Sequence, residues 1–153
     1  MVVRLRAFHD RDFEFVRELY FDTMRWVIER YFGWNRAQQK ETFSIWFKPS
    51  ETRIITADGT DVGWIQQRED RDEIFLGSIY IAPAMQGRGI GTYVIQELLH
   101  VARHRSQAVT LSVMKINPAL RLYQRLGFRT THEDQYKFYM RADPEAAVSC
   151  PNN

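Results

Sequence analysis

The sequence contains a single cysteine, Cys150, among its 153 residues. One cysteine excludes an internal disulfide and a cysteine-based metal site, so we expect neither in this chain. No apolar run approaches the roughly 18 to 20 residues that span a bilayer, and no apolar leader segment follows Met1. We therefore expect a cytoplasmic protein with no membrane partner and no metal.

An excess of charge of one sign is also lacking. The 21 Lys and Arg residues nearly balance the 19 Asp and Glu residues, which leaves a formal net charge of +2 at pH 7. Basic residues are scattered among acidic ones and form no run, whereas nucleic-acid-binding proteins usually gather them on one face. Nucleic acid is therefore not an expected partner.

The chain has no Pro-, Gly- or Ser-rich linker and no internal repeat. Its length and its 44% apolar composition are typical of one globular domain with one core. We place this domain at residues 1–142 and expect a disordered tail at residues 143–153, which includes Cys150.

Apolar periodicity and turn-forming residues predict an alternation of helices and strands. The Asp58-Gly59 turn joins two strands into a hairpin, and Asn117-Pro118 is a typical helix start. The predicted elements, in chain order, are strand 2–7, helix 10–30, helix 35–47, strands 53–57 and 62–67, strand 73–81, a helix that ends at residue 104, strand 108–114, a helix from residue 117, and strands 128–131 and 135–140.

Glycines are concentrated in Gln86-Gly87-Arg88-Gly89-Ile90-Gly91, between a predicted strand and a predicted helix. Such a loop lets the backbone approach a ligand closely, and the unpaired N–H groups and dipole of a helix start attract phosphate. The loop is not a P-loop, because no Gly-Lys-Ser/Thr follows it. It fits a dinucleotide fingerprint poorly, because Thr92 replaces the third glycine and Met114-Lys115 stand where an acid is needed. A turn that uses glycine only for packing remains open.

Two motifs flank this region in a fixed order. Ile79-Tyr80-Ile81-Ala82-Pro83 precedes the loop, and Asn117 opens a helix that ends in Leu122-Tyr123-Gln124-Arg125-Leu126-Gly127-Phe128. The chain from residue 79 to 128 therefore resembles the GNAT superfamily of acyl-CoA-dependent N-acyltransferases, which shows Gln/Arg-x-x-Gly-x-Gly/Ala and Leu-Tyr-x-x-Leu-Gly-Phe at these places. The resemblance implies an α/β (α+β) fold with a mixed, mostly antiparallel β-sheet flanked by helices. The sheet would be splayed between the strands that end at Ile81 and Met114.

The resemblance also implies acetyl-CoA as the acyl donor, with no metal. The backbone of Ile79, Tyr80 and Ile81 would pair with the pantetheine arm. Asn117 would meet the pantetheine from the next helix, and it has an equally good structural role as a helix cap. The residues expected to hold the pyrophosphate are Gln86, Gly87, Arg88, Gly89, Ile90, Gly91 and Thr92.

Tyr123 matches the tyrosine that protonates the departing thiolate in many family members, so we expect it to be the catalytic acid. A core tyrosine that packs with Leu120 and Leu126 is the alternative. The base is not identified, because Ser112 stands where some members use a glutamate and cannot accept the proton. The bases left open are Glu73, Glu29, the cluster His132-Glu133-Asp134, and a chain of water molecules.

The expected activity is acetylation of a primary amine by direct attack in a ternary complex. Cys150 is not expected to form an acyl-enzyme, because it lies in the tail. A non-catalytic acyl-CoA-binding sensor or scaffold is the alternative. We expect a small-molecule amine as acceptor in preference to a protein, because an aromatic wall can enclose a compact group or a cation. The aromatic residues before the hairpin, which are equally suited to a core or a homodimer face, are Trp26, Tyr31, Phe32, Trp34, Phe43 and Trp46.

Overall fold

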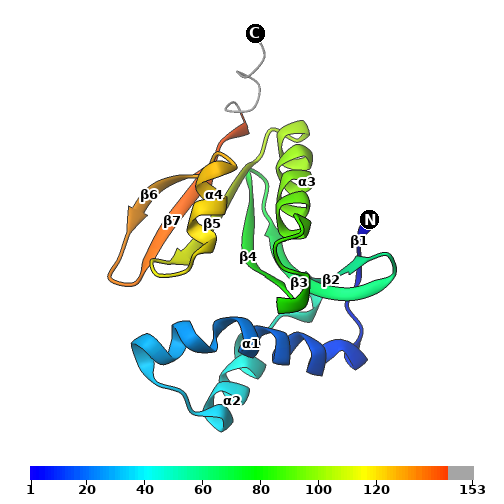
Figure 1. Ribbon diagram of the computed structural model, residues 1–153. Helices are drawn as coiled ribbons and strands as arrows, with labels where there is room; N and C mark the ends of the chain where they lie inside the picture. Colours follow the sequence, from blue (N-terminus) through cyan, green and yellow to red (C-terminus); the bar gives the residue numbers. More distant parts are fainter. Residues whose placement is uncertain (145–153) are drawn as a thin grey trace. The chain divides into compact units, whose positions relative to one another are not determined.

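The computed structural model describes residues 1–144 (Figure 1). The sequence predicts disorder for residues 143–153. Residues 145–153 of this range lie outside the described residues. Asp143 is described, and its carboxylate accepts hydrogen bonds from Arg129 and Arg141. Short 3-10 turns cover Asp10–Asp12, Pro49–Glu51 and Pro83–Met85. The helices and strands are β1 (Val3–Ala7), α1 (Phe13–Phe32), α2 (Arg36–Trp46), β2 (Thr52–Ala57), β3 (Thr60–Glu69), β4 (Glu73–Ile81), α3 (Ile90–His104), β5 (Ala108–Met114), α4 (Ala119–Arg125), β6 (Arg129–Glu133) and β7 (Lys137–Ala142).

The seven strands hydrogen-bond in the order β1-β2-β3-β4-β5-β7-β6. The pairs β1–β2, β2–β3, β5–β7 and β6–β7 are antiparallel, and β4–β5 is parallel. The register between β4 and β5 covers Glu73–Leu76 and Ala108–Leu111, although β4 continues to Ile81 and β5 to Met114. The predicted α/β class with a mixed, mostly antiparallel sheet and flanking helices is confirmed.

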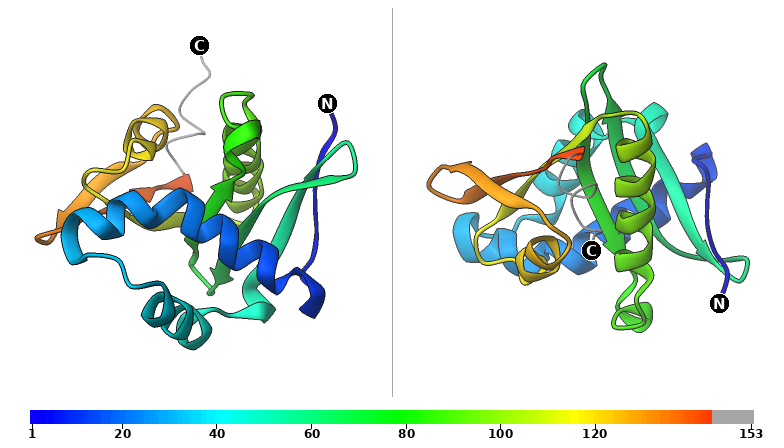
Figure 2. Two further views of the ribbon diagram at one scale, coloured as in Figure 1. Left: turned by 60° about the horizontal axis from the view of Figure 1, so that its bottom comes forward. Right: turned by 90° about the horizontal axis from the view of Figure 1, so that it is seen from above.

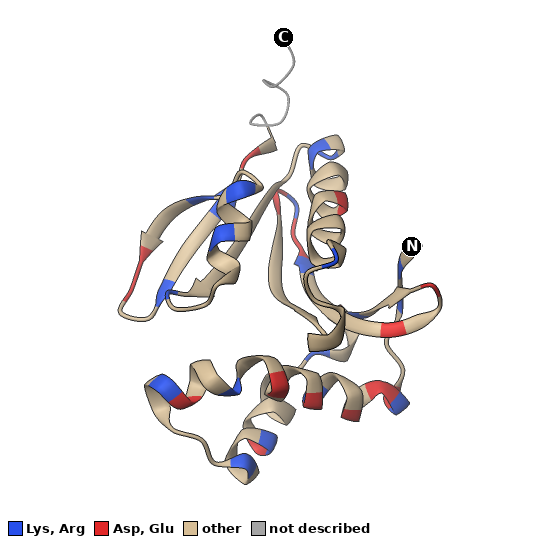
Figure 3. Cartoon of the chain, viewed as in Figure 1, with Lys and Arg blue, Asp and Glu red and all other residues tan. Residues whose placement is uncertain are grey.

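Two compact units divide the chain. The first comprises residues 1–66 and 78–91, and the second comprises residues 67–77 and the chain from residue 92 onward. Acidic and basic residues are mixed along α1 and α2, whereas α4 carries basic residues and no acidic ones (Figure 3). Across residues 1–144, no helix is long and apolar enough to span a membrane, and no group of three or more potential metal ligands is found.

The core of the first unit is rich in aromatic side chains. Its rings meet mainly edge to face, as between Phe13 and Phe47 at 5.7 Å and between Phe43 and Trp64 at 6.4 Å. Helices α1 and α2 thus pack together over β2 and β3 (Figure 2). The buried residues of this core are Val16, Leu19, Phe43, Phe47, Ile54 and Trp64.

The core of the second unit is aliphatic. It lies between α3 and the strands β4, β5 and β7, where alternate residues of β5 face inward. Its buried side chains include Ile74, Ile95, Val109, Leu111 and Met140.

Local chemistry explains where several elements begin and turn. Asp58 and Gly59 both adopt positive φ, 50° and 84°, as a two-residue hairpin turn requires. Asn35 caps α2, because its side-chain oxygen accepts a hydrogen bond from the Gln38 N–H at 2.9 Å. The predicted hairpin and the predicted limits of β4 and β5 are confirmed.

The last two strands begin and end later than the sequence suggested. Phe128 was expected to open a strand, but its N–H donates to the Tyr123 carbonyl and completes the turn after α4. Asp134 then fixes the connection between β6 and β7 by accepting hydrogen bonds from the N–H groups of Tyr136 and Lys137. The strands therefore occupy Arg129–Glu133 and Lys137–Ala142.

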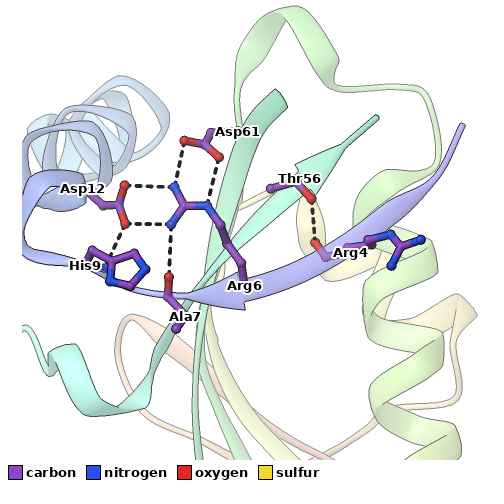
Figure 4. Close-up of polar contacts among 7 residues, drawn as sticks. All are labelled: Arg4, Arg6, Ala7, His9, Asp12, Thr56 and Asp61. Carbon is purple, nitrogen blue, oxygen red and sulfur yellow. Dashed lines mark hydrogen bonds and ion pairs between the residues drawn. The ribbon is translucent and has the colours of Figure 1, made fainter. Parts of the chain in front are cut away.

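A partly buried ion pair joins β1 to the start of α1 in the first unit (Figure 4). The Arg6 guanidinium donates to both Asp12 carboxylate oxygens at 2.9 Å and also to Asp61 at 2.9 Å. Asp12 is only 5% exposed and accepts a further hydrogen bond from the His9 N–H. The hydrogen bonds from Arg6 lower the pKa of Asp12 to about 2, although burial alone would raise it.

We expect this pair to make the stability of the protein depend on pH. The pKa of an aspartate in an unfolded chain is about 4, so the stabilisation is fully present above about pH 4 and is lost as the pH falls toward about 2. The difference in pKa corresponds to at most about 2 to 3 kcal/mol. Asp12→Asn should therefore lower the free energy of unfolding at about pH 7, and the deficit should shrink by about pH 3.

Urea unfolding of wild type and variant at both pH values measures this difference. Asp22→Asn, an exposed substitution on α1, is the matched control and should change stability little at either pH. An Asp12→Asn deficit of equal size at both pH values would show that the loss comes from packing and not from ionisation.

Candidate functional site

The glycine loop joins β4 to α3, and its backbone has the conformation that glycine favours. Gly87 and Gly89 adopt φ of 77° and 82°, a region that other residues rarely occupy. A Cβ atom added at either position would have no neighbour within 4 Å, so both glycines face open space. Because α3 begins at Ile90, the loop delivers the unpaired N–H groups of a helix start beside this space.

Side-chain contacts hold the loop against the end of β4. The Gln86 side-chain amide donates to the Ile81 carbonyl at 2.9 Å. A Cβ atom on Gly91 would lie 3.8 Å from Ile81 Cγ1, which is an ordinary contact. Arg88 is exposed, and no ion pair to it is found within residues 1–144. The loop is therefore fixed at its base, while Arg88 presents a positive charge.

Gly63 on β3 was not identified from the sequence. A Cβ atom there would lie 2.3 Å from the Tyr80 carbonyl oxygen, so only glycine allows β3 to approach β4 this closely. The Ala82 N–H donates to the Val62 carbonyl at 2.8 Å beside it. A glycine inside a predicted strand was the available signal, because such a glycine often marks a close backbone approach.

The side chain of Tyr80 packs against other rings. Its ring centroid lies 5.1 Å from that of Trp64 and 5.5 Å from that of Tyr20, and Tyr20 in turn lies 5.2 Å from Trp46. Trp64 is fully buried, whereas Tyr20, Trp46 and Tyr80 are half-buried. These four residues, which we call the ring chain, lead from the core of the first unit toward its surface.

Other aromatic residues expected to wall the acceptor are placed differently. Trp26 is 48% exposed on α1. Trp34 packs edge-on against Phe21, with the Arg25 guanidinium 5.2 Å from its ring. Phe43 is completely buried in the core. The sequence did not single out Tyr20 or the ring of Tyr80, because nothing local marks residues that meet through the fold.

Asn117 lies at the start of α4 in the second unit. Its side-chain oxygen accepts a hydrogen bond from the Ala119 N–H at 2.9 Å, and its carbonyl accepts one from the Leu120 N–H. These contacts give Asn117 the capping role that the sequence suggested. Its role toward pantetheine stays a prediction.

Tyr123 is 8% exposed and comes from the middle of α4. Its ring packs edge-on against Phe128 at 5.8 Å. Burial raises the pKa of the Tyr123 phenol to about 12, so the hydroxyl stays protonated at neutral pH. The residue can therefore serve as a proton donor, and it is also a packed core residue.

The candidate bases have structural partners. Ser112 lies on β5 opposite Tyr139 of β7. The Glu73 carboxylate accepts a hydrogen bond from the Thr110 hydroxyl at 2.9 Å and lies 3.7 Å from the Arg141 guanidinium. Glu29 lies 3.4 Å from Arg25 on the exposed side of α1.

The cluster at residues 132–134 is similarly engaged. His132 stacks on the Tyr139 ring at 4.4 Å, and Glu133 forms an ion pair with Lys115 at 2.6 Å. Asp134 accepts a hydrogen bond from the Tyr139 hydroxyl at 2.7 Å, which lowers the pKa of Asp134. A carboxylate with a lowered pKa is a weaker base, so this hydrogen bond makes Asp134 less suitable for accepting a proton.

Residues 13–128 match the Acetyltransferase (GNAT) family. The chain belongs to this GNAT family. The family that the two motifs suggested is therefore confirmed over most of the chain.

Two curated relatives are named as acetyltransferases. A mycothiol acetyltransferase of Acidimicrobium ferrooxidans is 34% identical over 105 residues, which are 64% of this chain and 33% of that protein. An L-2,4-diaminobutyric acid acetyltransferase of Nocardia farcinica is 35% identical over 75 residues, which are 46% of this chain and 39% of that protein. The chain thus spans less than half the length of these relatives.

Solved structures share the fold at lower identity. The PaiA N-acetyltransferase from Thermoplasma acidophilum, solved in complex with coenzyme A, has a TM-score of 0.76 and 16% identity, and the match covers 94% of this chain and 99% of that chain. The ribosomal-protein-S18-alanine N-acetyltransferase from Escherichia coli has a TM-score of 0.66 and 17% identity, with 93% and 94% covered. These likenesses show the GNAT fold and do not identify an acceptor.

Proposed function

We propose that this GNAT protein transfers the acetyl group of acetyl-CoA to a primary amine of a small molecule. The observation that carries the proposal is the loop at the start of α3, where Gly87 and Gly89 hold positive φ beside open space. Such a loop suits the pyrophosphate of coenzyme A, because backbone N–H groups and the helix dipole favour anions.

The residues of the chain have the following roles in this proposal. The backbone of Ile79, Tyr80 and Ile81 and the side chain of Asn117 hold the pantetheine arm. The loop from Gln86 to Thr92 holds the pyrophosphate, with the Arg88 guanidinium adding charge. Bound acetyl-CoA supplies an activated thioester, and no metal takes part.

The acyl transfer needs two proton movements. The neutral amine attacks the thioester carbonyl carbon within the ternary complex, an N–C bond forms, and the C–S bond breaks. Tyr123, whose hydroxyl is protonated at neutral pH, donates its phenolic proton to the departing thiolate. The raised pKa makes the phenol a weaker acid, so the donation depends on close placement of the hydroxyl beside the sulfur. The amine loses its own proton to water, since Ser112 cannot act as a base and the carboxylates considered above are paired.

We infer a compact acceptor with an apolar or aromatic part. Two relatives are named for acceptors that are small molecules, mycothiol and L-2,4-diaminobutyric acid. In this chain, half-buried Tyr20, Trp46 and Tyr80 provide ring faces next to the strand proposed to bind pantetheine. Ring faces contact apolar groups and attract cations, so they suit a small amine.

We expect an amine panel to separate the possible functions. Release of free thiol from acetyl-CoA is followed with L-2,4-diaminobutyrate, aliphatic diamines, aromatic amines and short peptides as acceptors. At least one small amine should support turnover of about 1 s⁻¹ or more, within the usual range for enzymes.

Turnover with peptides alone would overturn the small-molecule assignment. If acetyl-CoA raises the melting temperature but no amine increases thiol release, the chain is the acyl-CoA sensor considered as the alternative.

A further inference from the structure

A cavity of about 420 Å³ lies within the second unit, at the ends of α3 and α4 and beside the first residues of β5. Its volume falls in the range of small-molecule sites. It shares no residue with the proposed acetyl-CoA site, and its buried apolar surface comes from Ala102, Val109 and Ala142. The other lining residues are Leu99, Arg103, Gln107, Arg125, Leu126, Gly127, Asp143 and Pro144.

Gln107 lines this cavity and carries a buried, unsatisfied acceptor. The residue is 5% exposed, and its side-chain N–H groups donate to the Glu69 carboxylate at 3.0 Å, the Asp70 carbonyl at 3.0 Å and the Arg71 carbonyl at 3.3 Å. These acceptors fix the orientation of the amide, because a flipped amide would place its oxygen against them. Within the described chain, Gln107 Oε1 finds no donor. A buried acceptor of this kind gains most from a ligand that brings an N–H or O–H group.

Two arginines provide positive charge at the same cavity. Arg103 and Arg125 are exposed, and among residues 1–144 neither has an ion pair. The Asp143 carboxylate forms ion pairs with Arg141 at 2.6 Å and with Arg129 at 3.0 Å. Basic residues are visible on α4 and at the end of α3 in Figure 3. They also complement the negative ends of the two helices, so the charge alone does not define a ligand.

We propose that this cavity binds a small organic carboxylate that carries an N–H donor. The carboxylate pairs with the guanidinium groups of Arg103 and Arg125, which match its two oxygens. The N–H group donates to Gln107 Oε1, and an apolar side chain of the ligand lies on Ala102, Val109 and Ala142. The site is separate from acetyl transfer and does not depend on the proposed function.

N-acetyl-L-leucine is a suitable probe, because it combines one carboxylate, one amide N–H and a branched apolar side chain. N–H correlation spectra of the isotope-labelled full-length protein are recorded during a titration. Saturable shifts are expected at the backbone amides of Gln107, Leu126 and Gly127 and at the Gln107 side-chain amide. N-acetyl-L-leucinamide, which lacks the charge, and N-acetyl-N-methyl-L-leucine, which lacks the N–H, should each bind at least about tenfold more weakly.

Variants separate ligand binding from the support of helix ends. The double variant Arg103→Gln/Arg125→Gln should raise the Kd for N-acetyl-L-leucine by about tenfold or more. Arg121→Gln, one turn earlier on α4 and outside the cavity lining, should change it by less than about twofold. The dispersion of the same spectra shows whether each variant is folded. If the double variant is unfolded, titration of the wild-type protein with the two analogues still tests the proposal. Absent or non-saturable shifts, or equal binding of the neutral analogue, would overturn the proposal.

Discussion

Replacing Tyr123 with phenylalanine is expected to lower kcat by about 10²- to 10⁴-fold, because general-acid assistance usually contributes that much. The substitution removes one hydroxyl and keeps the ring, so the edge-on contact with Phe128 should persist and α4 should still pack. The expected loss is therefore confined to the departure of the thiolate. Steady-state kinetics with an acceptor found in the amine panel, together with direct measurement of the acetyl-CoA Kd, checks this expectation.

The raised pKa of Tyr123 adds a second test. Because the phenol ionises only near pH 12, wild-type kcat should show no loss from Tyr123 deprotonation between about pH 7 and about pH 10. Tyr93→Phe makes the same chemical change at an exposed position on α3 and should leave kcat within about twofold. If Tyr123→Phe weakens acetyl-CoA binding instead of lowering kcat, Tyr123 is a packing residue. If kcat and the acetyl-CoA Kd of Tyr123→Phe both stay within about twofold of wild type, the acid role is wrong.

The stabilisation of the folded protein by acetyl-CoA should disappear in Gly89→Val. A ligand at 100 times its Kd stabilises the native state by about 2.7 kcal/mol, which a thermal melt detects readily. Valine disfavours the φ of 82° at this position, and its side chain would project into the open space beside the loop. Both effects act on the backbone that we propose contacts the pyrophosphate.

Gly59→Val is the matched control, because Gly59 also has a positive φ, 84°, and also faces open space. It lies in the β2–β3 turn, so it should lower the stability of the ligand-free protein by a similar amount and keep the response to acetyl-CoA. Gly91→Ala introduces only an ordinary contact with Ile81 and should leave the ligand-free protein folded. A full acetyl-CoA response in Gly89→Val would remove this loop from the cofactor site.

The predictions that agreed with the structure concern features that depend on short-range contacts along the chain. Asp58-Gly59 forms the expected turn, and Asn117 caps α4, because both depend only on neighbours in the chain. The first α-helix instead begins at Phe13, three residues after the predicted start at residue 10. At this helix start, the Asp12 carboxylate accepts a hydrogen bond from Arg6 of β1. The same guanidinium also donates to Asp61 of β3. Residues from two strands therefore fix where the helix begins.

The candidate site divides in the same way. Its glycine loop could be predicted, because glycine content and a strand-to-helix position are sequence features with a direct backbone meaning. The ring chain through Tyr20 and Tyr80 could not, because its members come from different helices and strands. The assigned roles toward acetyl-CoA remain predictions for the experiments above.

The sequence by itself determined the family, the order of helices and strands, and the loop at the start of α3, since motif spacing and glycine conformation are properties of the chain. Only the tertiary structure decided that Tyr123 is buried with a raised pKa, that Glu133 and Asp134 are already paired, and that Gln107 Oε1 finds no donor within the described chain. Burial, ion pairing and hydrogen-bond satisfaction depend on groups that are distant in sequence and meet only in the folded protein.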